Sequence, residues 1–191
     1  MARQYETLTG THRAFVERQQ MFFVASAAAT GRVNVSPRGT DCFRIVDDRT
    51  VTYLDRTGSG NETAAHLCAD GRLTVMFCAF EGAPMILRLY GRGRVLRRGG
   101  ADYAAMLARH FDGREPIGPR QIVVLDVDLV QTSCGFGVPL YDHRGSRDAL
   151  DRWAEAKGEE GLLVYQREKN VRSMDGFPTG LFDDTNIESS H

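Results

Sequence analysis

Seven short apolar or alternating segments dominate the first 132 residues of this 191-residue chain. Only two segments of helical character, residues 61–69 and 101–110, interrupt them, and the other connections have the composition of turns. Segments of strand length at such short intervals favour a closed antiparallel barrel over a parallel α/β sheet. The sequence therefore predicts a mainly β (α+β) fold of six or seven antiparallel strands with helices on the rim. The predicted strands are residues 21–27, 33–36, 42–46, 50–55, 72–80, 85–96 and 121–132.

The last third of the chain has a different character, because glycine and proline residues break the alternation after Cys134. Helices are predicted there at residues 146–157 and 161–170, and a further short helix is predicted near the start of the chain, at residues 12–20. We expect one domain with a helical appendage and a frayed polar end. Its expected parts are the barrel at residues 1–134, a C-terminal helical extension at 135–182 and a flexible tail at 183–191.

The composition limits the kind of partner. The chain has 24 basic and 25 acidic residues, so it offers no electrostatic argument for binding nucleic acid or an anionic membrane. No apolar run approaches the roughly 20 residues that span a bilayer, and the N-terminus has no apolar signal region. The four cysteines are too widely spaced for a C-x-x-C motif. We expect free thiols, a cytoplasmic location, and a small molecule or a second copy of the chain as partner.

A glycine-rich turn joins the predicted strand 50–55 to the predicted helix 61–69. Gly58 and Gly60 permit positive φ and let a ligand approach the main chain. Ser59 stands three residues before Glu62, which is the spacing of a capping box. The free amides at the helix N-terminus, assisted by Arg56, would bind a phosphate. The alternative is an ordinary strand–turn–helix connection in which the glycines only turn the chain.

A second polar group follows the strand at residues 33–36. Pro37 cannot donate to a ladder, and it is predicted to end that strand at Ser36. Arg38 and Gly39 then place a guanidinium group and an unobstructed peptide at the strand end. The segment is either part of a binding site or a polar turn with a solvated arginine.

The order of these segments resembles the pyridoxamine 5'-phosphate oxidase-like family of FMN-binding split barrels, and in particular its flavin-nucleotide-binding branch. The resemblance covers about residues 12–132 and is carried by residues 22–26, 33–39, 53–56, 58–61 and 87–91. It implies a six- to seven-stranded antiparallel split β-barrel. It also implies a homodimer that holds FMN in two clefts at the subunit interface.

Matched position by position, the resemblance implies a set of cofactor-binding residues. One strand end lies by the isoalloxazine ring and the phosphate, a second contacts the flavin, a turn binds the phosphate, and a returning strand reaches the ring. In that order they are Ser36, Pro37, Arg38 and Gly39; Leu54, Asp55 and Arg56; Ser59, Gly60 and Asn61; and Arg88.

The chain departs from the oxidase of this family in two places. Asn61 stands where the oxidase has a lysine, so Arg38 or Arg56 must supply the missing positive charge. The C-terminal arginine and tryptophan signature that binds pyridoxamine phosphate is missing, so that activity is not implied. Trp153 stands instead in a short helix, where packing is the commoner role of a tryptophan and lining of the partner's cleft is the alternative.

The resemblance implies an FMN-dependent oxidoreductase that acts on a small molecule, with a reduced pyridine nucleotide as a candidate electron donor. The flavin would carry the redox chemistry, so no catalytic side chain of this chain is required. The alternatives are a flavin-binding or storage module without turnover, or a cleft that takes a deazaflavin or haem. For haem, His66 is the histidine expected near the cleft. His66 and Cys68 do not share a helix face, and no metal site is predicted.

Overall fold

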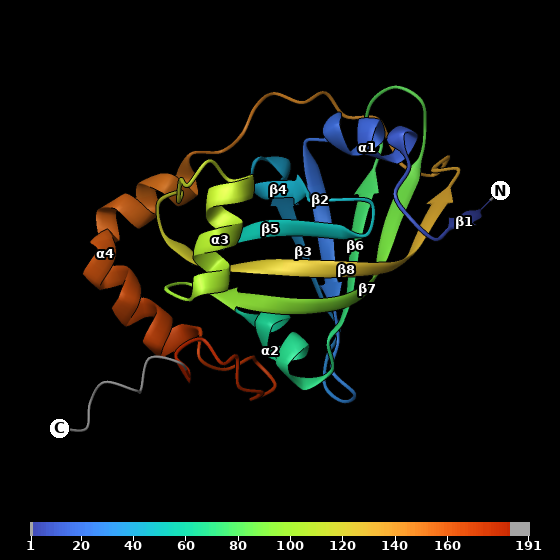
Figure 1. Cartoon of the computed structure of the whole chain (residues 1–191). Coiled ribbons are helices and arrows are strands. Elements are labelled where there is room, and N and C mark those ends of the chain that lie inside the picture. The colour runs from blue at the N-terminus through green and yellow to red at the C-terminus, as the bar shows by residue number, and fades with distance from the viewer. Residues whose placement is uncertain (1, 184–191) are drawn as a thin grey trace.

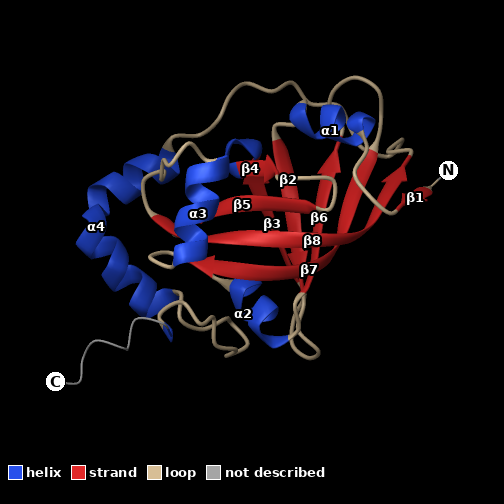
Figure 2. Cartoon of the chain, in the orientation of Figure 1, coloured by secondary structure: helices blue, strands red, loops and turns tan. Residues whose placement is uncertain are grey.

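One curled antiparallel sheet forms the centre of the molecule in the computed structural model, which describes residues 2–183 (Figures 1 and 2). The path of the sheet is β3-β2-β6-β7-β8-β5-β4, and β1 pairs with β8 outside this path. All of its pairings are antiparallel, which confirms the predicted split β-barrel. The strands are β1 (Arg3–Tyr5), β2 (Met21–Ser26), β3 (Asn34–Gly39), β4 (Phe43–Ile45), β5 (Thr50–Arg56), β6 (Arg72–Cys78), β7 (Ile86–Arg97) and β8 (Pro119–Ser133).

Two strand predictions need correction. The strand after residue 33 does not end at Ser36, because β3 continues through Pro37 to Gly39, and Pro37 pairs with Phe23. β3 is the first strand of the path, so one of its edges has no neighbour and the missing proline N–H leaves no ladder bond unmade. The short strand β1 was not predicted, since its three residues contain no alternating pattern.

Four helices lie around the sheet (Figure 2). The expected pair of C-terminal helices is one helix interrupted at Gly158, whose φ of 65° and ψ of 173° are not helical. Trp153 packs edge-on against Tyr165 across this interruption, with ring centroids 5.1 Å apart. The helices are α1 (Gly10–Glu17), α2 (Glu62–Ala69), α3 (Ala101–His110) and α4 (Ala149–Lys169).

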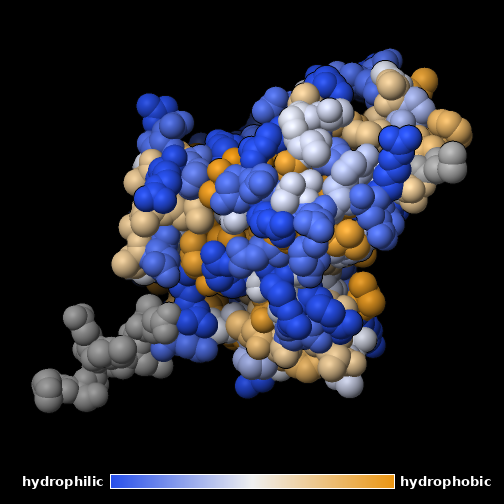
Figure 3. All heavy atoms as spheres, turned by 45° about the vertical axis from the view of Figure 1, so that its right-hand side comes forward, coloured by the Kyte–Doolittle hydropathy of each residue, from blue (hydrophilic) through white to orange (hydrophobic). Residues whose placement is uncertain are grey.

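Residues 134–148, here called the strap, connect β8 to α4 without regular secondary structure. In Figure 1 the strap runs along the top of the molecule, past α1, to reach α4. Polar side chains dominate the face in Figure 3, and apolar atoms form separate patches among them. Within residues 2–183, no helix combines the length and the apolar character needed to cross a membrane. The expected tail falls outside the described residues, except for Asp183.

Aromatic residues from four strands meet in the core of the barrel. Phe22, at the centre of this group, has ring centroids 5.0 Å from Phe43, 5.6 Å from Tyr53 and 5.7 Å from Phe77. All four side chains are buried. Because they come from β2, β4, β5 and β6, their contacts tie both ends of the strand path together.

Replacing Phe22 by alanine should lower the free energy of unfolding by about 3–5 kcal/mol, because the removed ring leaves a cavity between three aromatic neighbours. Urea unfolding measures the change. Phe136→Ala is the control, since Phe136 is 81% exposed and its loss should cost under about 0.5 kcal/mol. Equal effects of the two substitutions would contradict this description of the core.

Candidate functional site

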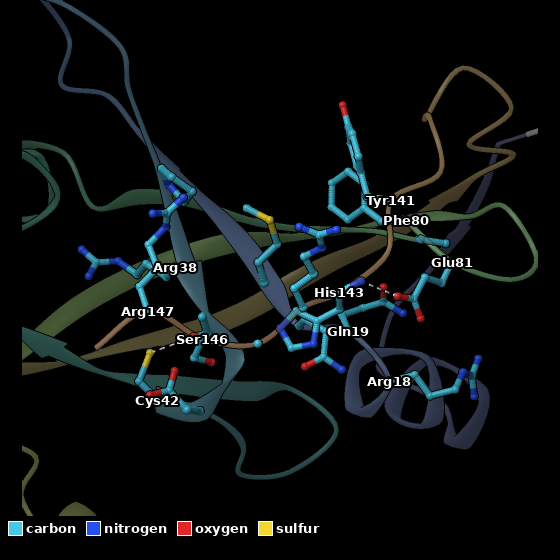
Figure 4. Close-up of a pocket in the computed structure, with 18 of the residues that line it drawn as sticks. Arg18, Gln19, Arg38, Cys42, Phe80, Glu81, Tyr141, His143, Ser146 and Arg147 are labelled. Atoms are coloured by element: carbon cyan, nitrogen blue, oxygen red, sulfur yellow. Dashed lines mark hydrogen bonds between the residues drawn. The ribbon is translucent and has the colours of Figure 1, made fainter. Parts of the chain in front are cut away.

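A cleft of about 1070 Å³ opens beside the edge strand β3 (Figure 4). Its walls come from the end of α1, from β3, from the end of β5, from the loop after β6 and from the strap. This volume lies at the top of the range of roughly 300–1,000 Å³ that is usual for small-molecule pockets. The cleft therefore has room for one large ligand or for two smaller ones.

The strap forms one wall of this cleft. The Tyr141 amide donates a 3.0 Å hydrogen bond to the Phe80 carbonyl, and the two rings lie 5.6 Å apart. The His143 amide donates a 3.0 Å hydrogen bond to Glu81 Oε1, the dashed contact in Figure 4. Arg38 and Arg147 lie on the other side of the same view. The wall is thus attached to the loop after β6 by hydrogen bonds and an aromatic contact.

The predicted site residues fall into two groups. Five of them line the cleft: Pro37, Arg38, Gly39, Leu54 and Arg56. The other six are not part of its lining: Ser36, Asp55, Ser59, Gly60, Asn61 and Arg88. Thr57 and Gly58 do line it, so the cleft reaches the start of the glycine-rich turn.

A buried ion cluster lies behind the cleft and is centred on Asp55. The carboxylate is 1% exposed, and its Oδ2 accepts hydrogen bonds from Arg120 Nε at 3.0 Å, Arg120 Nη2 at 2.7 Å and Gln121 Nε2 at 2.8 Å. Burial by itself would raise the pKa of Asp55, but the guanidinium groups of Arg120 and Arg38 hold the pKa below its usual value. Asp55 is therefore ionised and balanced by two cations.

Arg38 connects this cluster to the cleft. Its Nη1 lies 2.6 Å from Asp55 Oδ1 as an ion pair, without the alignment of a hydrogen bond, and its guanidinium lies 4.8 Å from the centroid of the Tyr53 ring. Burial acts to lower the pKa of Arg38, and the Asp55 carboxylate overcomes it and raises the pKa above its ordinary value. Arg38 Nε is buried and has no hydrogen-bond partner in the described part of the chain. Arg38 therefore brings a fixed positive charge and an unused donor to the cleft wall.

The glycine-rich turn differs from its prediction in two details. The residue at the N-terminus of α2 is Asn61, no side chain caps it, and the Glu62 carboxylate accepts from the Met174 amide instead of completing a capping box with Ser59. Neither Gly58 nor Gly60 has a positive φ. Gly58 leaves space instead, because an added Cβ there would meet nothing within 4 Å. The turn is thus shaped by contacts with distant segments and not by local capping.

Two carbonyl groups of this turn point into the buried polar cluster. The Gly58 carbonyl accepts from Asn170 Nδ2 at 3.0 Å, and the Gly60 carbonyl accepts from Arg120 Nη1 at 2.8 Å. All peptide bonds here are trans, so the N–H of the same peptide unit points the opposite way. The amides of Ser59 and Asn61 therefore face away from the cluster, and neither donates a hydrogen bond within residues 2–183.

The side chain of Asn61 does not face a ligand. It is buried, donates from Nδ2 to the Asn170 carbonyl at 3.2 Å and accepts from Gln121 Nε2 at 2.8 Å. Ser36 is also turned away from the cleft, and its hydroxyl donates to Asn34 Oδ1 at 3.1 Å. Asn61 can thus contribute to a ligand site through its main chain.

The two remaining predicted arginines have partners within the chain. Arg56 lines the cleft, donates from Nε to the Ile117 carbonyl at 2.9 Å and pairs from Nη2 with Asp151 at 2.5 Å. Arg88 lies on β7, where its Nη1 donates to Ser133 Oγ at 3.3 Å. Within one chain Arg88 therefore belongs to a different surface from Arg38.

Several residues that shape this site were not predicted. Arg120 and Asn170 are buried next to the turn, although residues 116–120 have the composition of a proline- and glycine-rich link. The signal was a charged residue directly before an apolar strand. His66 is buried and hydrogen-bonded to Ser26 Oγ at 3.0 Å, and the histidine that lines the cleft is His143. Among the described residues, no group of three or more His, Cys, Asp or Glu side chains is arranged to hold a metal ion.

The fold and the cleft define a split-barrel protein with a small-molecule site beside its edge strand. The family model described as pyridoxamine 5'-phosphate oxidase matches residues 8–134, and the chain belongs to this family. It is 40% identical over 190 residues to the pyridoxamine 5'-phosphate oxidase family protein ustO of Aspergillus flavus, covering 91% of this chain and 76% of that protein.

Solved structures support the same fold. The HupZ protein of Group A Streptococcus matches with a TM-score of 0.52 and 23% identity, over 64% of this chain and 91% of that chain. A protein from Lactobacillus delbrueckii matches with a TM-score of 0.51 and 16% identity, over 66% of this chain and 94% of that chain. At these identities the likeness concerns the barrel and not its ligand.

The ion cluster makes stability depend on pH. Because the pKa of Asp55 is lower in the folded protein, its stabilisation is present above the unfolded value of about 3.9 and is lost as the pH falls through the folded pKa. Asp55→Asn should lower the free energy of unfolding by about 3 kcal/mol at pH 7. This difference should shrink below about pH 4.

Urea unfolding of both proteins from pH 3 to pH 7 measures this difference. Asp126→Asn is the matched control, because Asp126 pairs with Arg94 at the surface and its loss should cost under about 1 kcal/mol. A cost at Asp55 that stays constant over the whole pH range would show that the carboxylate charge is not what stabilises the fold.

Proposed function

We propose that this protein binds FMN in the cleft, as a homodimer, and is a flavin-dependent oxidoreductase that acts on a small molecule. The observation that carries the proposal is the pair of outward-facing amides at Ser59 and Asn61, together with the fixed cation of Arg38. Main-chain amides at a helix N-terminus and a nearby guanidinium group are suited to a phosphate monoester. Membership of the pyridoxamine 5'-phosphate oxidase family supports the same ligand.

The residues present fit the phosphoryl end of a flavin nucleotide. The free Arg38 Nε and the amides of Ser59 and Asn61 are unused donors, and the open space at Gly58 lets a phosphate approach the main chain. Arg120 offsets the nearby Asp55 carboxylate, so the charge of Arg38 is not fully consumed by Asp55. A phosphate at this position would meet donors and no unbalanced carboxylate.

The ring of the flavin would lie along the cleft wall formed by Pro37, Arg38 and Leu54. When bound, the flavin supplies the redox chemistry. The Arg38 guanidinium would orient the ring and favour negative charge next to it, and apolar lining residues such as Leu54 and Phe80 would exclude water. None of the chain's own side chains is assigned a proton transfer or a covalent step.

The remaining volume of the cleft is assigned to a second molecule. A cleft of about 1070 Å³ is larger than one cofactor site requires, so the space under the strap would take the substrate or the reduced pyridine nucleotide that donates electrons. Pyridoxamine phosphate is not proposed as the substrate, because the C-terminal arginine and tryptophan signature of that oxidase is missing from this sequence.

A homodimer is proposed from the outer face of the sheet. Alternate residues of β2 and β3 face outward there, including Phe23, Val35 and Pro37, and Val35 is 60% exposed. Apolar side chains on an open sheet face are typical of an interface. Arg88 lies on this same face, in register with Met76 of β6, so its predicted contact with a flavin would be made across the subunit boundary.

A second candidate ligand is haem, which one observation favours: the imidazole of His143 is exposed and lines the cleft, where it is available as an axial ligand. A deazaflavin, or flavin storage without turnover, are the other outcomes. The absorbance spectrum separates flavin, deazaflavin and haem. Anaerobic bleaching of the flavin band by NADH or NADPH, with recovery in air, separates an oxidoreductase from a storage protein.

Replacing Arg38 by methionine should weaken FMN binding about 10- to 100-fold, because a charge-assisted hydrogen bond contributes about 1.5–3 kcal/mol. Fluorescence titration of FMN measures the dissociation constant, and mass spectrometry of the small molecule released on denaturation identifies the native ligand. Arg94→Met, on the far strand β7 and paired with Asp126, should bind FMN like the wild type. Unchanged FMN affinity in Arg38→Met would move the phosphate site elsewhere.

Replacing Val35 by lysine should convert the dimer into monomers, because the change places a charge in the proposed interface without altering the core of one chain. Light scattering after size exclusion gives the mass. Val164→Lys on α4 is the control, as Val164 is also half-exposed and lies away from the sheet face. A wild-type protein that elutes as a monomer would exclude the proposed interface.

A further inference from the structure

Asn170 follows the last residue of α4 and is completely buried, with an exposed fraction of 0%. Its side chain bridges two neighbours of the glycine-rich turn: Nδ2 donates to the Gly58 carbonyl at 3.0 Å, and Oδ1 accepts from Arg120 Nη1 at 2.9 Å. The same Arg120 nitrogen donates to the Gly60 carbonyl at 2.8 Å. One amide group thus holds one carbonyl of the turn directly and the other through Arg120.

We propose that Asn170 is a positioning residue for the phosphate of the bound nucleotide, which makes the C-terminal extension a functional part of the cofactor site. This inference rests on the proposed function. The extension lies outside residues 8–134, the part of the chain that matches the family model. The ligand class concerned is the phosphate monoester at the end of a flavin nucleotide.

The proposed role follows from the geometry of the peptide group. Because carbonyl and N–H point in opposite directions in a trans peptide, fixing the Gly58 and Gly60 carbonyls inward fixes the amides of Ser59 and Asn61 outward. The turn supplies no lysine, so these amides have to be ordered before the phosphate arrives if they are to bind it strongly. Asn170 provides this order from a position that never contacts the ligand.

Other contacts of the extension support the same turn from both sides. Gln166 Nε2 donates to Thr57 Oγ1 at 2.7 Å, immediately before Gly58. The Met174 amide donates to the Glu62 carboxylate at 3.1 Å, immediately after Asn61. The Thr179 hydroxyl donates to the Asn170 carbonyl at 2.7 Å and holds Asn170 itself in place. The turn is therefore enclosed by residues 166–179 at both of its ends.

The test compares the affinities of the full-length chain for FMN and for riboflavin, which lacks the phosphate. Dissociation constants are measured by flavin fluorescence on protein prepared without bound flavin. Asn170→Ala should weaken FMN binding by about tenfold or more and should leave riboflavin binding within about twofold of the wild type. Gln166→Leu, which removes only the contact to Thr57, should change the FMN affinity in the same direction by a smaller factor.

A control variant separates positioning from general loosening of α4. Tyr165→Leu removes the aromatic contact with Trp153 but no contact to the turn, so it should keep the wild-type ratio of FMN to riboflavin affinity. If the wild type binds FMN and riboflavin equally, the proposed phosphate site itself is wrong. If the wild type prefers FMN and both Asn170→Ala and Gln166→Leu keep that preference, only the role of Asn170 is overturned.

Two further results complete the test. A loss of preference in Tyr165→Leu equal to that in Asn170→Ala would also overturn the inference, because the effect would then come from a loosened helix. Thermal unfolding of each variant verifies that it is folded. If Asn170→Ala does not fold, Gln166→Leu decides the question by the same ratio.

Discussion

The buried carboxylate of Asp55 is the group around which the site is built. It lies between Arg38, which faces the cleft, and Arg120, which faces the glycine-rich turn. A carboxylate and two guanidinium groups cannot be buried without one another, because an unpaired buried charge costs several kcal/mol. The cluster therefore fixes Arg38 at the cleft wall, and through Arg120 it fixes the Gly60 carbonyl.

The barrel explains why these groups can meet. β5 carries Asp55 and lies next to β8, which begins with Pro119 and Arg120, so Asp55 and Gln121 are paired across the sheet. The register shifts between Asp55 and Arg56, where the ladder ends and the turn begins. The C-terminal extension then closes over this end of the sheet and brings Asn170 to the turn. The proposed phosphate site thus depends on three segments whose contacting residues are at least 50 positions apart in the sequence.

Local patterns predicted the barrel well and the site only in part. Alternation of apolar residues located seven of the eight strands, since burial on one face of a sheet repeats every second residue. Pro37 was assigned to a strand end because its position on an edge strand was not known from the sequence. Ser59 and Glu62 have capping-box spacing, yet Glu62 accepts from Met174, which lies 112 residues away. Short-range rules do not include such long-range competitors.

The same limit explains why Arg120 and Asn170 were not predicted. Neither lies in a motif, and each acquires its place only when a distant segment packs against the turn. Resemblance to the family identified the turn but assigned Asn61 a place on the phosphate, whereas its side chain is occupied by Asn170 and Gln121. What the turn offers to a ligand is its main chain, and this can be seen only from the direction of its carbonyl groups.

A crystal structure of the protein with FMN would test this account most directly. We predict that a phosphate oxygen lies within about 2.7–3.2 Å of the Ser59 and Asn61 amide nitrogens, with the Gly58 and Gly60 carbonyls still bound to Asn170 and Arg120. A phosphate bound elsewhere, or a turn whose amides point into the buried cluster, would contradict it.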